Sequence, residues 1–262
     1  MSFDASLRLG ELIAAAARNH ARVSPPPRGL PFFGLDQRSG SAVDLLGTLA
    51  SHGIFRKYEL VLDLSAHLGM SSRWLATMLG CTAVATASSV AEATAAGALT
   101  KAAQLHDQVH HVAADPCALP FTDEAFTHVW SVEALASLAR PAAVIAETFR
   151  VLRPGGHLAV QELVATTGSP SAVAGATFER ADRWTAVLAR AGFVDVAVRD
   201  VSAHARESMA LLTTARARLD ASLEVAGRAE PALAAAARER VVLNACLATS
   251  SLGLIQILAR HP

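Results

Sequence analysis

An acidic residue followed by a short turn is the part of this sequence best suited to bind a ligand. Asp63 ends an apolar run, and the turn after it leads into a segment with helical character. Strand, tight turn and helix in this order place a ligand at the carboxyl end of a parallel strand. Turns that bind nucleosides or dinucleotides favour glycine where the backbone approaches the ligand. Here Ser65 and His67 stand at the first two glycine positions, and only Gly69 remains.

A second acid that could bind a ligand lies in the loop Asp115-Pro116-Cys117-Ala118-Leu119-Pro120-Phe121. Its side chain could accept hydrogen bonds from a ligand, or it could only shape the loop. His106, His110 and His111 are close in sequence, but a change from helix to strand between them keeps them off one common face. The sequence therefore predicts no metal site, and it identifies no catalytic residue.

The elements that would position these residues alternate between helices and strands. Expected strands cover 59–64, 81–86, 108–113, 125–131, 157–164, 194–201 and 252–259. Expected helices cover 4–21, 41–52, 71–79, 90–105, 142–152 and 178–190, and nearly all of 207–250, where Pro231 starts a second helix. Arg153 to Gly156 should end a helix and reverse the chain. Alternation of this kind predicts a parallel sheet with helices on both faces.

Composition narrows the function classes. The 262 residues contain 23 Lys+Arg and 23 Asp+Glu, so the zero net charge favours neither nucleic acid nor acidic partners. The sequence is 52% hydrophobic, but its first apolar run is far shorter than the ~20 residues of a membrane-spanning helix. The three cysteines are scattered and fit reduced thiols. We expect a cytoplasmic protein without a membrane or nucleic-acid partner, and the sequence leaves its oligomeric state open.

The N-terminal segment carries an aromatic pair, Phe32 and Phe33, within a proline-rich loop. This pair could be a plug over one end of the core or part of a lid over a ligand site. We expect residues 1–58 to form a helical cap or lid and residues 202–250 a helical insertion, both within one domain that spans 1–262.

Several motifs resemble those of class I S-adenosylmethionine-dependent methyltransferases, in the branch that acts on small molecules. The matching stretches follow one another in the family's order: Val61-Leu62-Asp63 with Gly69, Asp115 with Leu119-Pro120-Phe121 and Phe126, Trp130-Ser131-Val132-Glu133-Ala134, and Glu147 with Arg150-Val151-Leu152-Arg153-Pro154-Gly155-Gly156. The resemblance implies a Rossmann-like α/β fold with a mostly parallel seven-stranded sheet and a helical insertion before the last strand. It also implies S-adenosylmethionine as cofactor and a small-molecule acceptor, whose identity the sequence does not give.

The resemblance also assigns roles to individual residues. Asp63 would orient the amino group of the cofactor, and Asp115 would accept the adenine amino group. An acid at the end of the second strand holds the ribose diol in the family. The cofactor-binding residues implied are Asp63, Leu64, Ser65, His67, Gly69, Ala87, Ser88, Asp115, Pro116, Trp130 and Ser131.

Some positions depart from the family pattern. Ala87 stands in place of the ribose-binding acid, and Glu92 lies too far along the next helix to replace it without bending the register. Ser137 and Arg140 stand where several relatives carry a His and an Asp that deprotonate the acceptor.

Three hypotheses follow from these matches and departures. The chain is a methyltransferase with an altered cofactor pocket, a methyltransferase-fold binding or partner subunit that no longer methylates, or a catalyst of another reaction such as a cyclisation with His67 as acid or base.

Overall fold

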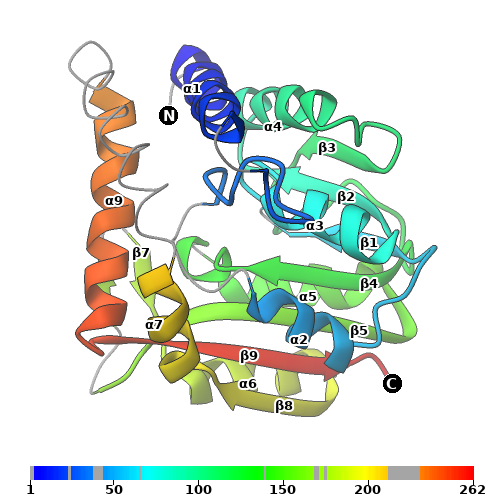
Figure 1. Cartoon of the computed structure of the whole chain (residues 1–262). Coiled ribbons are helices and arrows are strands. Elements are labelled where there is room, and N and C mark those ends of the chain that lie inside the picture. The colour runs from blue at the N-terminus through cyan, green and yellow to red at the C-terminus, as the bar shows by residue number, and fades with distance from the viewer. Residues whose placement is uncertain are drawn as a thin grey trace.

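The computed structural model describes residues 3–22, 25–37, 44–64, 66–138, 140–167, 171–173, 176–211 and 231–262 (Figure 1). The strands are β1 (Leu60–Asp63), β2 (Thr82–Ala87), β3 (Val109–Ala113), β4 (Phe126–Val132), β5 (Leu152–Ala165), β6 (Ser171–Val173), β7 (Ala176–Phe178), β8 (Val194–Asp200) and β9 (Leu252–Arg260). The helices are α1 (Phe3–Ala21), α2 (Leu45–His52), α3 (Met70–Leu79), α4 (Val90–Ala102), the short 3-10 helix η1 (Leu135–Ser137), α5 (Pro141–Val151), α6 (Ala181–Ala191), α7 (Ser202–Leu211) and α9 (Pro231–Ala248).

Seven of these strands form one sheet in the order β3-β2-β1-β4-β5-β9-β8. The pairs from β3 to β5 are parallel, whereas β9 runs antiparallel to both β5 and β8. The predicted α/β fold with a mostly parallel seven-stranded sheet is confirmed. Because β1 and β4 lie in the middle of the sheet, the turn after β1 opens at its centre, where α/β proteins of this topology bind ligands.

The side chains of successive residues along β1 contribute to two hydrophobic clusters, one on each face of the sheet. Leu62 and Leu64 join the cluster under α5 and α6, while Val61 joins the cluster under α2 and α3. Successive strand residues point to opposite faces, so Asp63 shares the face of Val61 and lies beside the start of α3. The buried acid is therefore placed by the same alternation that forms the core.

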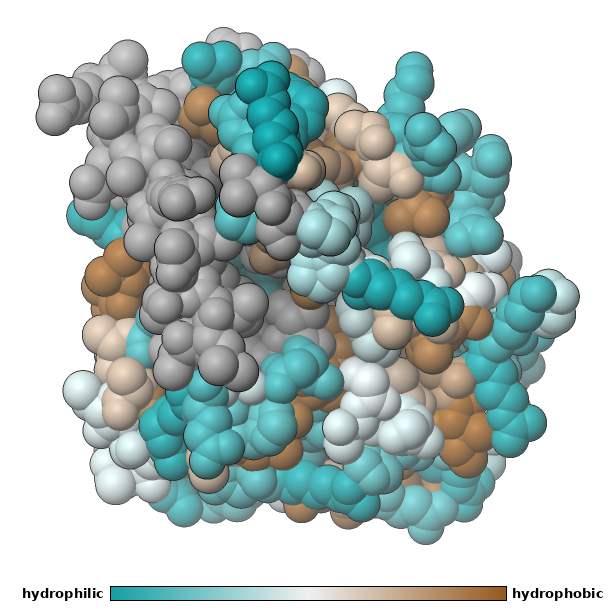
Figure 2. Space-filling view, viewed as in Figure 1, coloured by the Kyte–Doolittle hydropathy of each residue, from teal (hydrophilic) through white to brown (hydrophobic). Residues whose placement is uncertain are grey.

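The N-terminal helix α1 packs beside α4 at the top of Figure 1. Phe32 and Phe33 are buried in the cluster that joins these two helices, which is the plug arrangement considered for this pair. Asp36, a few residues later, is also buried. On the face shown in Figure 2, hydrophilic residues cover much of the described surface, and hydrophobic residues are interspersed among them.

Three expected elements differ from those observed. Residues 176–178 form β7, which pairs with β6, so the helix expected from 178 begins only at Ala181. The residues Arg153 to Gly156 belong to β5 and form an irregularity in its pairing with β4, where Gly155 has φ +77°. The helix expected to reach 105 ends at Ala102. Parts of two other expected helices, residues 41–43 and 212–230, lie outside the described residues.

The motif around Glu147 and Arg150 fastens a loop to α5. Arg150 donates hydrogen bonds to the carbonyl oxygens of Leu119 and Phe121 at 3.1 and 2.8 Å and to Asp123 at 2.8 Å. Glu147 accepts the Leu119 N–H at 2.8 Å and pairs with Arg150 at 2.7 Å. Two of the family-like stretches are thus one structural unit, which holds the loop that begins at Asp115.

A histidine pair lies near the start of β4. The rings of His128 on β4 and His157 on β5 stack with their centres 5.7 Å apart, and His128 also packs against Phe55. Burial lowers the pKa of both imidazoles, although Glu59, 3.5 Å from His128, opposes this for His128. A base with a lowered pKa in the folded state stabilises the fold above its unfolded pKa and destabilises it as the pH falls.

We therefore expect the two rings to make the fold less stable as the pH falls from about 7.5 to 5.5, because the unfolded chain takes up protons that buried His128 and half-buried His157 resist. The raised pKa values of the buried acids Asp63 and Glu162, about 6 and about 8, act in the opposite direction over this range. His128→Phe keeps an aromatic ring at this place and removes one of the destabilising contributions. The free energy of unfolding at pH 5.5, relative to that at pH 7.5, should therefore be higher in the variant than in the native chain, as measured by urea unfolding. An identical difference in the two proteins would contradict this role for His128.

Candidate cofactor and acceptor site

Asp63 is a fully buried carboxylic acid at the end of β1. Its Oδ2 accepts hydrogen bonds from the hydroxyls of Ser71 and Ser72 at 2.5 and 2.6 Å, while Oδ1 has no hydrogen-bond partner among the described residues. Burial raises the pKa of Asp63 to about 6, and the two serine hydrogen bonds oppose the rise. The carboxylate is therefore ionised at neutral pH and presents one buried oxygen to a positively charged or hydrogen-bonding ligand.

The turn after Asp63 keeps the backbone shape of a glycine turn despite its substitutions. His67 has φ +50° and Gly69 has φ +80°, both in the left-handed region that glycine adopts without strain. Ser65 lies outside the described residues. The chain closes with hydrogen bonds from Gly69 N–H to the Ala66 carbonyl and from Ala66 N–H to the Thr86 carbonyl, each 2.8 Å. The histidine at the second glycine position thus alters what the turn presents, while the turn stays tight.

The end of β2 carries a carboxylate after all, contrary to the expectation for Glu92. Ala87 is the buried last residue of β2, and Ser88 follows it. Glu92, in the first turn of α4, folds its side chain back so that Oε2 accepts the Ser88 N–H at 2.9 Å and the Ser88 hydroxyl at 2.7 Å. The expectation that Glu92 is too distant is wrong, because a side chain at the third position of a helix reaches back over the helix start.

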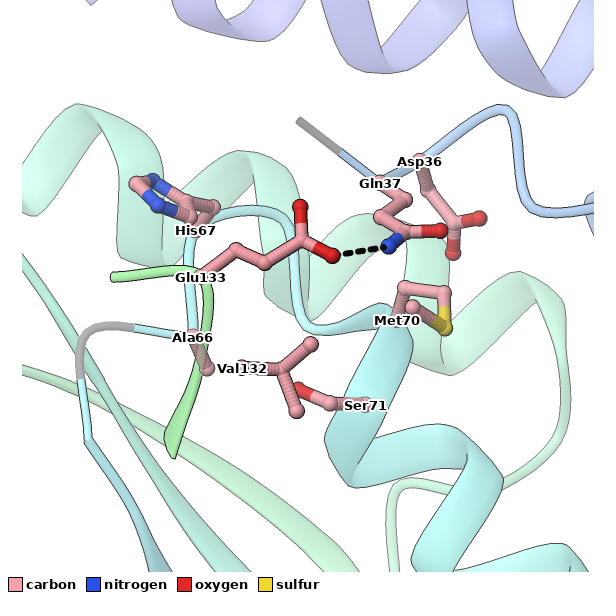
Figure 3. A pocket seen from close by; sticks show the side chains of 8 residues that line it. All are labelled: Asp36, Gln37, Ala66, His67, Met70, Ser71, Val132 and Glu133. Atoms are coloured by element: carbon pink, nitrogen blue, oxygen red, sulfur yellow. Dashed lines mark hydrogen bonds between the residues drawn. The ribbon is translucent and has the colours of Figure 1, made fainter. Parts of the chain in front are cut away.

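Figure 3 shows a small cavity beside this turn. Its empty volume is about 270 Å³, including space open to solvent. The lining residues come from the segment before α2, the turn after β1, the start of α3 and the end of β4: Asp36, Gln37, Ala66, His67, Met70, Ser71, Val132 and Glu133. Glu133 and Gln37 point toward each other with 3.4 Å between Gln37 Nε2 and Glu133 Oε1, while the His67 ring points away from them (Figure 3).

Trp130, Ser131 and Asp115 are not among the residues that line this cavity. Trp130 is fully buried in the core under α2 and α3, where it stacks on Trp74 at 6.2 Å. The neighbouring Ser131 is also fully buried. Asp115 is exposed, accepts the Cys117 N–H at 2.8 Å and pairs with Arg140 at 3.5 Å. The loop-shaping role considered for Asp115 is therefore visible in the structure, and its binding role stays a prediction.

A buried arginine connects the turn to the segment before α2. Arg73 on α3 pairs with Asp36 at 2.5 Å, and both side chains are almost completely shielded from solvent. The same guanidinium donates to the carbonyl oxygen of Leu68 at 2.7 Å and to the hydroxyl of Thr100 at 2.9 Å. Arg73 therefore holds together the turn, helix α4 and the segment that brings Asp36 and Gln37 to the cavity.

Of the eight residues that line the cavity, only His67 was among the predicted site residues. Three of the other seven carry a carboxyl or amide group: Asp36, Gln37 and Glu133. Glu133 was quoted only as part of a motif, yet an acid directly after a buried strand is itself a signal for a site at the sheet edge. Its backbone has φ +55°, and its carboxylate is also within 3.4 Å of Gln161 Nε2. Asp36 and Gln37 follow an irregular loop, so no periodicity could have placed them.

Among the described residues, no group of three His, Cys, Asp or Glu side chains is arranged to hold a metal ion. Within the same part of the chain, no helix combines the length and hydrophobicity that crossing a membrane requires.

Comparison of the sequence with known proteins identifies one family. A methyltransferase domain family matches residues 62–160. The methyltransferase GfsG of Streptomyces halstedii is 30% identical over 158 residues, which are 56% of each protein. The sterol 24-C-methyltransferase ERG6 of Saccharomyces cerevisiae is 30% identical over 118 residues, or 45% of this chain and 31% of that enzyme. The chain thus spans about half the length of the first of these relatives and less of the second.

Solved structures extend the likeness to most of the chain. The [4+2]-cyclase SpnF superimposes with a TM-score of 0.72 at 22% identity and covers 98% of this chain and 96% of its own. A geranyl diphosphate methyltransferase in complex with S-adenosylmethionine has a TM-score of 0.63 at 15% identity, with 84% of this chain and 85% of its own covered. At these identities the likeness shows the fold.

Proposed function

We propose that this chain is a class I S-adenosylmethionine-dependent methyltransferase and that it transfers a methyl group from that cofactor to a small-molecule acceptor. The observation that carries the proposal is the buried carboxylate of Asp63 at the end of a central strand: one of its oxygens accepts a hydrogen bond from Ser71 in the cavity wall, and the other has no partner among the described residues. A buried carboxylate oxygen that accepts no hydrogen bond is costly unless a ligand supplies the donor.

The residues present fit the amino acid end of the cofactor. Asp63 Oδ1 offers an acceptor for its ammonium group, and Ser71 and Ser72 fix the other oxygen of the carboxylate. The empty volume of about 270 Å³ includes space open to solvent, so the cavity accommodates only part of a nucleoside cofactor. The adjoining turn at His67 would have to contact the rest.

When bound, the cofactor supplies an electrophilic methyl group on a sulfonium. The reaction is an in-line displacement, so the protein's main task is to position the reactants and exclude water. Met70 and Val132 give the cavity an apolar wall that excludes water, and Asp63 orients the charged end of the cofactor. The plug formed by Phe32 and Phe33 keeps Asp36 and Gln37 in place over the cavity.

Glu133 is the residue we propose to receive the proton of the acceptor. Ser137 and Arg140 replace the acid–base pair of several relatives, and Glu133 is a carboxylate that lines the cavity directly. Gln37 and Gln161 hold its Oε1 from two sides at 3.4 Å. A carboxylate in this place suits an acceptor with a hydroxyl or amine group, whose proton leaves as the new bond to the methyl carbon forms.

The relatives set the acceptor class only broadly. Their names include sterol and tocopherol methyltransferases, which act on small molecules. We extend only that class to this chain. The expectations of a cytoplasmic location and of no nucleic-acid partner stay predictions, as does the division into a cap over 1–58 and an insertion over 202–250.

Calorimetric titration with S-adenosylhomocysteine, the demethylated product, tests the proposal. We expect the native chain to bind it with a dissociation constant in the millimolar range or below, and Asp63→Asn to weaken binding by about tenfold or more, since a hydrogen bond to a charged group is lost. The affinity should also fall below about pH 6, as Asp63 takes up a proton. Asp195→Asn, which alters an exposed ion pair on β8, serves as the control.

Failure of the native chain to bind would favour the alternatives raised by the sequence. If the chain no longer methylates, a variant with Ser65→Gly, His67→Gly and Ala87→Asp should bind S-adenosylhomocysteine, whereas the native chain should not. For a cyclisation, turnover should depend on His67, and a His67→Ala variant with unchanged turnover would exclude that role. Detection of a methylated product would contradict both.

A further inference from the structure

The carboxylate of Glu92 is held at the end of β2 in a fixed orientation. Its Oε2 accepts two hydrogen bonds from Ser88, at 2.9 Å from the N–H and 2.7 Å from the hydroxyl. Its Oε1 lies 3.3 Å from Nδ1 of His67, and the Glu92 side chain is only 16% exposed. A carboxylate has about four lone-pair positions, so these three contacts leave Oε1 with room for a further donor.

The start of α4 explains why this side chain folds back. Ser89 caps the helix and accepts the Glu92 N–H at 3.2 Å, which is one half of a capping box. In a complete capping box the glutamate would accept a hydrogen bond from the backbone N–H of the cap residue, Ser89. Glu92 instead accepts hydrogen bonds from Ser88, one residue earlier, so its charge lies at the end of β2. Burial would raise the pKa of the Glu92 carboxyl, but the hydrogen bonds from His67 and Ser88 outweigh it and lower the pKa to about 2.

Two further buried polar atoms, independent of Glu92 and without a hydrogen-bond partner among the residues that the structure describes, belong to the adjacent strand end and its turn. Asp63, at the end of the adjacent strand β1, has a buried Oδ1 without a partner among the described residues. The Nε2 atom of His67, on the turn between the two acids, is likewise buried and has no partner within the described part of the chain. Two carboxylates at neighbouring strand ends suit a ligand with a cationic group at one end and hydroxyl donors further along.

We propose that Glu92 binds the ribose hydroxyls of the cofactor in place of the acid missing at Ala87, and that His67 occupies this carboxylate until the ribose displaces it. This inference rests on the proposed function, because it concerns the same cofactor. Ser88 preorganises the carboxylate, so no helix movement is required. The polar contact thought to be lost at position 87 is supplied from five residues later in the chain.

The test compares two ligands on each protein by calorimetry: S-adenosylhomocysteine and its 2′,3′-dideoxy analogue. The native chain should prefer the hydroxylated ligand by about ten- to a hundredfold, and Glu92→Gln should abolish most of that preference. Because the preference is a ratio measured on one protein, it does not depend on the fraction that folds. Glu11→Gln, which alters an exposed ion pair on α1, should keep the native preference.

Two outcomes would overturn the proposal. A Glu92→Gln variant that retains the full preference would show that another group binds the hydroxyls, as would a native chain that binds both ligands equally. If the native chain binds neither ligand, the proposed function fails as well, so the two failures are distinguishable. His67→Ala should bind S-adenosylhomocysteine severalfold more tightly than the native chain, and weaker binding would refute competition by His67.

Discussion

Replacing Arg73 with methionine is expected to lower the free energy of unfolding by about 3–5 kcal/mol. The variant leaves Asp36 buried and unpaired, and the energy needed to bury an unpaired charge exceeds the energy of most single contacts. The carbonyl of Leu68 and the hydroxyl of Thr100 also lose their guanidinium donor. Urea denaturation at neutral pH measures the change.

Two comparisons separate this cause from a general loss of charge. Arg8→Met breaks an exposed ion pair with Glu11 and should change the stability by less than about 1 kcal/mol. The double variant Arg73→Met with Asp36→Leu should recover part of the loss, because the Asp36 carboxylate that would be left without its ion-pair partner is removed. A single Arg73→Met variant as stable as the native chain would contradict the role of this buried pair.

Gly69→Ala is expected to destabilise the fold by about 2–4 kcal/mol and to weaken S-adenosylhomocysteine binding at least tenfold. An alanine here would adopt a left-handed backbone, since φ is +80°, and its Cβ would lie 2.5 Å from Cε1 of His111. Neither neighbour can easily move away. His111 is bonded to Thr100 at 2.8 Å, and Arg73, whose Nη1 would be 3.0 Å from the new Cβ, is held by its buried partners.

Gly97→Ala provides a matched control, for which the free energy of unfolding should change in the opposite direction. Gly97 lies inside α4, and a Cβ built there meets nothing within 4 Å. The substitution should stabilise the protein by about 0.5–1 kcal/mol, because alanine favours the helix more than glycine does. The midpoints of thermal and urea unfolding should therefore fall in Gly69→Ala and rise in Gly97→Ala, relative to the native chain. Equal effects at the two positions would contradict the conformational argument for Gly69.

The order of strands and helices was predictable because hydrophobic alternation and glycine or proline breaks are local signals. Strand β1, helix α3 and the start of α9 at Pro231 all lie close to the expected positions. Pairing between short segments was not predictable: residues 176–178 form a strand only because 171–173 lie beside them. The parallel sheet followed from the alternation of elements, and the family resemblance supplied its seven strands and the helical insertion before the last of them. The antiparallel direction of β9 was not predicted.

The candidate site was predictable only where an acid follows a strand directly. Asp63 met that condition, and it is the residue on which the proposed function depends. Glu92 did not, since its position comes from a side chain folding back over a helix start. Asp36 is placed by a tertiary ion pair with Arg73, which connects residues 37 positions apart. Contacts of this range follow from the folded structure and leave no periodic signal in the sequence.

Strand β8 depends on β9 for its place in the sheet. In the described part of the chain β8 pairs with β9 alone, and β9 reaches the sheet through β5. During translation, residues 201–251 must leave the ribosome between these two strands, a delay of about 3–10 seconds at ordinary elongation rates. Throughout that time β8 and α6 lack their final edge partner. A premature stop before Leu252 would therefore remove two strands from the sheet rather than one.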